Sequence, residues 1–238
     1  MQRQPYYRSP RPSYLGQATL YLIIANVVVF GLTIFAPELT RAWLSLIPVR
    51  LFFRGEIWRL AAYLFIHGDF SHLFFNMIGL FFFGPVLERA LGTRRFWIYY
   101  FLCGCGSGLA AAIFYLLLGN GDANIIGASG AIFGIIAAYG LLFPNSTVYL
   151  NFILPIKAKW LVVIYGAMEL FATIQYAGGS RRGIANIAHL TGIVIGYFYI
   201  RGIGDFRKLI YRYKYRQAER LRKKRFKVYD GDDRPTYH

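Results

Sequence analysis

Six long apolar runs constrain the fold of this chain more than any other feature. They cover about 17–36, 71–91, 96–118, 125–143, 159–177 and 185–203. A helix of about 20 apolar residues crosses the hydrocarbon core of a bilayer. The chain is 56% hydrophobic and 18% aromatic, which is more apolar than a soluble domain of 238 residues needs to be. We therefore expect an all-α polytopic membrane protein built as a bundle of six transmembrane helices.

Composition divides the chain into three parts. Residues 1–16 are polar and Pro-rich, residues 17–203 hold the apolar runs, and residues 204–238 form a basic, Tyr-rich tail. The first run has no small-residue cleavage site, so we expect a retained helix and not a signal peptide. The connection 37–70 mixes Trp, Phe and Arg, which is typical of short helices lying at the bilayer interface.

The net charge of +16 is distributed unevenly. With six spans, 21 of the 27 Lys and Arg residues lie on the side of the two termini. The positive-inside rule therefore predicts that both termini are cytoplasmic, and we expect a bacterial inner (plasma) membrane protein. The basic tail is predicted to lie on anionic lipid, and no specific nucleic-acid partner is expected.

Two cysteines lie in the third run. Cys103 and Cys105 are two residues apart and point in different directions from a helix. We expect neither a disulfide nor a metal site there, and the sequence predicts no metal and no cofactor elsewhere.

Polar side chains inside spans are costly and indicate function. Ser129 and His189 each fall about four residues into their runs, the fourth and the sixth. His72 and Asn76, in the second run, share one helix face at i and i+4. These three runs enter the membrane from the same external side, so the four side chains are expected at one depth, roughly 6 Å below the entry points.

A serine next to a histidine is typical of nucleophilic catalysis, because neutral imidazole can take the hydroxyl proton. Asp69 and Asp122 lie in loops and Glu169 lies in the fifth run, so no carboxylate is expected to be well placed for a triad. The prediction is a dyad of Ser129 and His189.

The oxyanion formed by attack on a carbonyl needs donors in place before the reaction. The candidates are His72, Asn76 and the backbone N–H of Ser129. Gly127 is expected to leave room for substrate backbone beside the serine. Phe133, one turn further along, either orients the ring of His189 or fills space in the core, and the sequence leaves both open.

Two pairs of glycines follow the reactive residues at a spacing of four. Gly130 and Gly134 follow Ser129, and Gly192 and Gly196 follow His189. Such small residues let helices in a membrane approach closely. They predict that the fourth and sixth runs pack together.

The motifs resemble those of rhomboid intramembrane serine proteases over about 50–205. "GASGAIFG" resembles the GxSG motif, "HGDFSHLFFN" the second-helix pattern of two His and an Asn, and "AHLTGIVIG" the sixth-helix histidine with its glycine face. "EIWRLAAYLF" resembles the Trp-Arg motif of the first loop, at Trp58 and Arg59, and "GPVLERALGTRRF" the segment linking helices two and three.

The resemblance implies a six-helix rhomboid fold with Ser129 as nucleophile and His189 as general base. It also implies His72, Asn76 and the Ser129 amide as oxyanion donors, with His67 in a supporting place. The implied substrates are transmembrane segments of membrane proteins, cut near their outer end without a cofactor. The fifth helix and the loop after it resemble the gate and cap of the family, and Phe133 stands where some members carry Tyr.

Other membrane functions fit less well. A zinc protease would need a His-Glu-x-x-His helix, which is missing from the sequence. The "GIGD" at 202–205 resembles an aspartyl protease motif but falls at the cytoplasmic end of the last run. A transporter is expected to show broken helices and repeats. The remaining alternative is a catalytically inactive rhomboid-like protein that binds membrane clients; such members usually lack the serine or the histidine.

Overall fold

The computed structural model describes residues 16–150, 153–175 and 181–202, with side chains of the last range from 186 onward, and the isolated residues 213, 215 and 219. The predictions made for the N-terminal segment 1–16 and for a lipid-binding tail at 204–238 lie outside the described residues, apart from Gly16 and those three tail residues.

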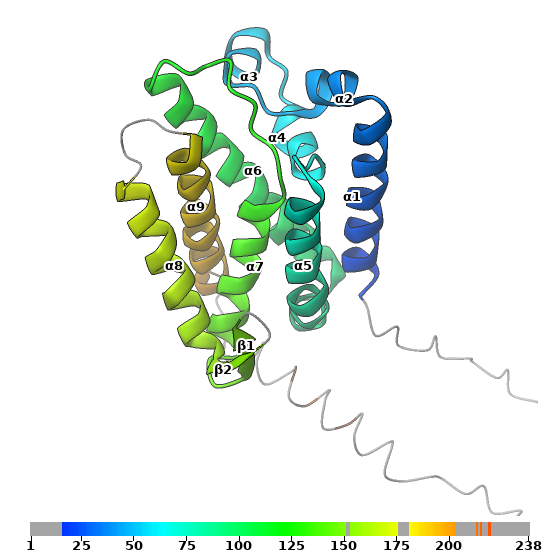
Figure 1. The fold of residues 1–238 in the computed structure, drawn as a ribbon. Coiled ribbons are helices and arrows are strands. Elements are labelled where there is room, and N and C mark those ends of the chain that lie inside the picture. The colour runs from blue at the N-terminus through cyan, green and yellow to red at the C-terminus, as the bar shows by residue number, and fades with distance from the viewer. Residues whose placement is uncertain are drawn as a thin grey trace, which may run out of the picture.

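A helix occupies each of the six apolar runs, and the six helices lie side by side in one bundle (Figure 1). Three of them are long and apolar enough to cross a bilayer within the described residues, and α7 is a shorter apolar helix. The predicted helix positions are thus confirmed, whereas the number of spans stays a prediction. The six helices are α1 (Gln17–Phe35), α5 (Phe70–Leu91), α6 (Thr93–Leu117), α7 (Ser129–Leu142), α8 (Ala158–Gln175) and α9 (Arg181–Gly202).

The outside of the bundle is apolar. Large hydrophobic side chains point outward from α1, α5, α6 and α8, where a soluble protein would place charges. This surface and the long apolar helices together indicate an integral membrane protein. Examples of the exposed side chains are Val28, Leu32, Phe82, Ile98, Val163 and Phe171.

The first connection folds into short helices, as expected, at the end of the bundle where α1 ends (Figure 1). Proline occupies the start of α2 and of α3, where its missing N–H costs nothing. Gly55, with φ +68°, ends α3 in the left-handed conformation. Their depth in a bilayer stays a prediction. These elements are α2 (Pro37–Leu44), α3 (Pro48–Arg54), α4 (Arg59–Ala62) and the 3-10 helix η1 (Tyr63–Phe65).

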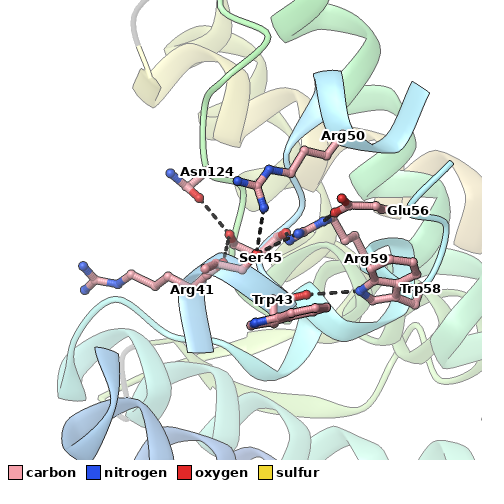
Figure 2. Close-up of polar contacts among 9 residues, drawn as sticks. Arg41, Trp43, Ser45, Arg50, Glu56, Trp58, Arg59 and Asn124 are labelled. Atoms are coloured by element: carbon pink, nitrogen blue, oxygen red, sulfur yellow. Dashed lines mark hydrogen bonds and ion pairs between the residues drawn. The ribbon is translucent and has the colours of Figure 1, made fainter. Parts of the chain in front are cut away.

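One buried arginine holds the first connection together (Figure 2). The guanidinium of Arg59 donates to the carbonyl oxygens of Ser45 at 2.6 Å and Ala42 at 2.7 Å, and it also pairs with Glu56. The hydroxyl of Ser45 lies 2.7 Å from the side-chain oxygen of Asn124. This arginine cluster therefore ties the first connection to the segment that leads into α7.

α7 begins later than the sequence predicts. The run was expected to be helical from about 125, but residues up to 128 lie outside the helix and Ser129 is its first residue. The reason is tertiary pairing: Ile125 exchanges backbone hydrogen bonds with Leu46, and the N–H of Gly127 donates to the carbonyl of Tyr63. Figure 1 shows this segment descending along the bundle before α7 starts. Ser129 thus reaches the interior at a helix start and not four residues into a helix.

A β-hairpin interrupts the all-α expectation. β1 (Thr147–Leu150) pairs antiparallel with β2 (Leu154–Lys157), with Thr147 opposite Lys157. It lies at the opposite end of the bundle from α2 and α3 (Figure 1). Thr, Val, Tyr and Ile supply strand propensity here, but the apolar runs predicted helices alone.

α9 lies against α6, α7 and α8, and glycines allow its closest approach to α7. A Cβ on Gly192 would lie 2.0 Å from the carbonyl oxygen of Gly130, and one on Gly196 would lie 3.1 Å from that of Gly134. The predicted glycine packing of these two helices is confirmed. It brings their backbones close enough for short side chains to meet.

At the end of the bundle where α1 begins, a buried carboxylate holds neighbouring helices together. Glu88, 3% exposed, accepts hydrogen bonds from the backbone N–H groups of Ala18 and Thr19 and from the hydroxyls of Thr19 and Thr93. Three helices meet there, because Glu88 lies on α5 while its donors begin α1 and α6. A carboxylate at helix N-termini is favoured by the free N–H groups and the helix dipole.

Candidate active site

The predicted serine and histidine are in hydrogen-bond contact. Oγ of Ser129 lies 2.7 Å from Nε2 of His189. Ser129 is the first residue of α7, and His189 lies eight residues after the start of α9 at Arg181. Their depths match because the extended segment before α7 carries the serine inward. The predicted depth of four residues, counted from the ends of the two apolar runs, stays a prediction.

The ring of Phe133 stacks on the imidazole of His189, with centroids 4.4 Å apart and an angle of 7° between the planes. Phe133 lies one turn after Ser129 on the same helix. One face of the imidazole is therefore covered by an aromatic ring, and the role of Phe133 in orienting it stays a prediction.

His72 and Asn76 line the same cavity as Ser129 and His189. Asp69 caps α5 by accepting from the backbone N–H of His72 at 2.8 Å, which fixes the first turn that carries this histidine. The hydrogen bond from the Ser71 hydroxyl, and after it the one from the His72 N–H, lower the pKa of Asp69. The side-chain nitrogen of Asn76 is buried and, among the described residues, has no hydrogen-bond partner.

Gly127 is required on two grounds. Its φ is +108°, which other residues rarely adopt. A Cβ there would also lie 2.6 Å from Nε2 of His72. The imidazole of His72 thus lies where a side chain would begin, and the predicted room for substrate beside the serine stays a prediction.

His67 lies just outside α5 and is 1% exposed. Its ring meets that of His72 edge to face, with centroids 4.9 Å apart. Burial, and after it the neighbouring His72, lower the pKa of His67 to about 4. His67 is therefore neutral near pH 7 and buttresses His72 without contributing a charge.

A cavity of about 770 Å³ opens onto these residues. α5 and α7 supply most of its walls, and α8 contributes Leu161 and Tyr165. Thr147, Val148 and Tyr149 of the hairpin also line it. The sequence did not predict the part played by the hairpin, because strand pairing at 147–157 depends on how the connection folds between α7 and α8.

One carboxylate lies closer to the histidine than the sequence predicts. Oε1 of Glu169 lies 3.1 Å from Nδ1 of His189, at ion-pair distance, although the N–H is not aligned on the oxygen as a hydrogen bond requires. α8 packs against α9, and the rotation of α8 turns this residue toward the histidine. A carboxylate inside an otherwise apolar run was the available signal.

Fold and site together define a helical membrane protein with a serine and a histidine paired beside an internal cavity. A hydroxyl that donates to a neutral imidazole can act as a nucleophile, and helix N-terminal N–H groups can stabilise negative charge next to it.

Comparisons with known proteins support this class of protein. The family model described as the Rhomboid domain matches residues 54–206, so the chain belongs to the rhomboid family. The putative rhomboid protease YdcA of Bacillus subtilis (strain 168) is 41% identical over 145 residues, covering 60% of this chain and 65% of that protein.

More distant relatives extend the match. Rhomboid protease AarA of Providencia stuartii is 31% identical over 201 residues, covering 75% of this chain and 69% of that protein. RHOMBOID-like protein 5 of Arabidopsis thaliana is 32% identical over 150 residues, covering 63% of this chain and 45% of that protein. The chain spans about half the length of the plant relative and about two thirds of the length of the bacterial ones.

Proposed function

We propose that this protein is an intramembrane serine endopeptidase that cleaves transmembrane segments of membrane proteins near their outer end. The observation that carries the proposal is the contact of 2.7 Å between Oγ of Ser129 and Nε2 of His189 at the wall of the cavity. Membership of a family that includes bacterial proteins named as proteases supports it.

In the first step His189 acts as general base. Its Nε2 takes the proton of the Ser129 hydroxyl as Oγ attacks the carbonyl carbon of the scissile peptide. The same nitrogen then gives the proton to the leaving amine, which frees the C-terminal product and leaves an acyl-enzyme. A water molecule, deprotonated in turn by His189, hydrolyses the ester and restores Ser129.

The attack leaves negative charge on the carbonyl oxygen of the substrate. That charge needs hydrogen-bond donors close to the oxygen. The unpartnered side-chain nitrogen of Asn76 and the ring of His72 line the cavity and can supply them. The N–H of Ser129, at the start of α7, adds a backbone donor at the positive end of a helix dipole.

The substrate would reach this site from the membrane. The cavity is bounded by α5, α7 and α8 and is lined mainly by apolar side chains, which suits an unwound part of a transmembrane segment. The uneven distribution of Lys and Arg supports six spans with both termini in the cytoplasm, and we propose a bacterial inner membrane as the location.

The test is cleavage of a model transmembrane substrate by the purified protein in detergent. We expect the wild type to cut the substrate near its outer end, and Ser129→Ala and His189→Ala each to lower kcat at least about 10³-fold. Both variants should unfold at the wild-type temperature. Cleavage that persists in Ser129→Ala contradicts the mechanism, and a wild type that binds the substrate without cutting it favours a client-binding protein.

A further inference from the structure

The carboxylate of Glu169 lies beside the proposed base. Oε1 lies 3.1 Å from Nδ1 of His189, while Oε2 is buried without a hydrogen-bond partner in the described part of the chain. The two side chains are 17% and 18% exposed. The contact joins the middle of α8 to α9.

A carboxylate in this place is costly for the fold. It lies on a helix whose neighbouring side chains Met168, Leu170 and Phe171 point outward as large apolar groups. Removing a carboxylate from water in such surroundings is unfavourable unless it is fully paired. Glu88, by contrast, accepts four hydrogen bonds, as expected of a buried carboxylate that stabilises the fold.

We propose that Glu169 is a positioning residue for His189, which makes the reactive group a triad in which α8 supplies the carboxylate. This inference rests on the proposed function. Neutral imidazole exists as two tautomers, and only the one with its proton on Nδ1 leaves Nε2 free to accept from Ser129. A carboxylate beside Nδ1 selects that tautomer and stabilises the imidazolium formed when Nε2 takes the proton.

The remaining contacts of the ring fit this role. Phe133 covers one face of the imidazole, and Ser129 lies at Nε2, so the edge carrying Nδ1 is the one turned toward α8. The present angle is too poor for a hydrogen bond, and such contacts commonly tighten when substrate is bound. α8 also lines the cavity through Leu161 and Tyr165, so the base is fully oriented only while this helix packs on α9.

The test compares Glu169→Gln and Glu169→Asp with the wild type in the full-length purified protein. The readouts are kcat and KM on a transmembrane substrate, the rate of labelling by a fluorophosphonate, and the unfolding temperature. We expect Glu169→Gln to lower kcat and the labelling rate by about 10–10²-fold, because amide and carboxylate have the same shape but only the carboxylate stabilises the imidazolium. KM and the unfolding temperature should not change, and Glu169→Asp should recover part of the rate.

The matched control is Glu38→Gln, the same chemical change on the exposed side of α2, which should leave every readout unchanged. An unchanged kcat in Glu169→Gln overturns the inference while the proposed function stands. So does a variant whose unfolding temperature falls and whose kcat per folded protein does not, because that is the behaviour of a structural strut. A wild type that neither cleaves nor reacts with the fluorophosphonate overturns the proposed function and this inference with it.

Discussion

Two buried polar regions of this protein differ in how completely their atoms are paired. In the arginine cluster of the first connection, the three guanidinium nitrogens of Arg59 all have acceptors. Around the cavity, the side-chain nitrogen of Asn76 and Oε2 of Glu169 are buried without partners among the described residues. Among the described residues, the hydrogen bonds of the first region are complete and those of the second are incomplete.

Such a difference is expected between a network that stabilises the fold and a site that binds a ligand. Buried polar groups are nearly always paired, because an unpaired one loses its hydrogen bonds to water and gains nothing in return. A fold keeps such groups where function needs them. Changes in the arginine cluster should therefore affect stability, and changes around the cavity should affect turnover.

The largest expected effect is on stability, from Arg59→Ala. The substitution leaves the carbonyls of Ser45 and Ala42 and the carboxylate of Glu56 without their donor, and loss of one partner of a buried charged network costs roughly 3–5 kcal/mol. Chemical unfolding in detergent measures it. Arg41→Ala, an exposed arginine on α2, is the control and should leave the unfolding free energy unchanged. Full stability with reduced kcat in Arg59→Ala would remove the distinction between the two regions.

Asn76→Ala should lower turnover and leave stability nearly unchanged. It removes a donor that has no hydrogen-bond partner among the described residues, so the unfolding free energy should change little. Loss of one oxyanion donor lowers kcat by about 10²–10³-fold with KM nearly constant. Steady-state kinetics on the transmembrane substrate measure this, with the exposed loop residue Asn120→Ala as control. If kcat is retained while the protein loses stability, Asn76 belongs to the structural network instead.

Gly127→Ala should lower both stability and kcat, by smaller amounts than Arg59→Ala and Asn76→Ala respectively. A residue with a side chain is strained at φ +108°, at a cost of about 1–3 kcal/mol, and its Cβ must displace the imidazole of His72. We expect a lower unfolding temperature together with a lower kcat. Gly31→Ala in α1 is the matched control, because a Cβ there meets nothing within 4 Å and should leave both unchanged or raise stability slightly. Wild-type kinetics in Gly127→Ala would show that the position of His72 does not matter for turnover.

The sequence predicts the helices and the meeting of Ser129 with His189 well, because each depends on a local pattern. Apolar runs mark the helices, and the glycine spacing marks the face along which α7 meets α9. The start of α7 could not be predicted in this way. It depends on the pairing of Ile125 with Leu46 and of Gly127 with Tyr63, which joins segments far apart in the chain.

The contact of Glu169 with His189 is a second feature that the sequence does not predict. Glu169 is visible as a charge within an apolar run, but whether it faces lipid, α5 or α9 depends on the rotation of α8 about its own axis. That rotation is set by contacts along the whole helix, so a carboxylate that the sequence left without a role lies beside the base.

The most direct test of the account is to locate the residue that reacts with a fluorophosphonate. The purified protein is labelled in detergent and digested, and the modified peptide is identified by mass spectrometry, with His189→Ala and Arg41→Ala treated in parallel. We expect one adduct on Ser129, formed at the wild-type rate in Arg41→Ala and lost in His189→Ala, because in the proposed mechanism the hydroxyl is activated only by the imidazole 2.7 Å away. An adduct on another residue, or labelling of Ser129 that continues without His189, would contradict it.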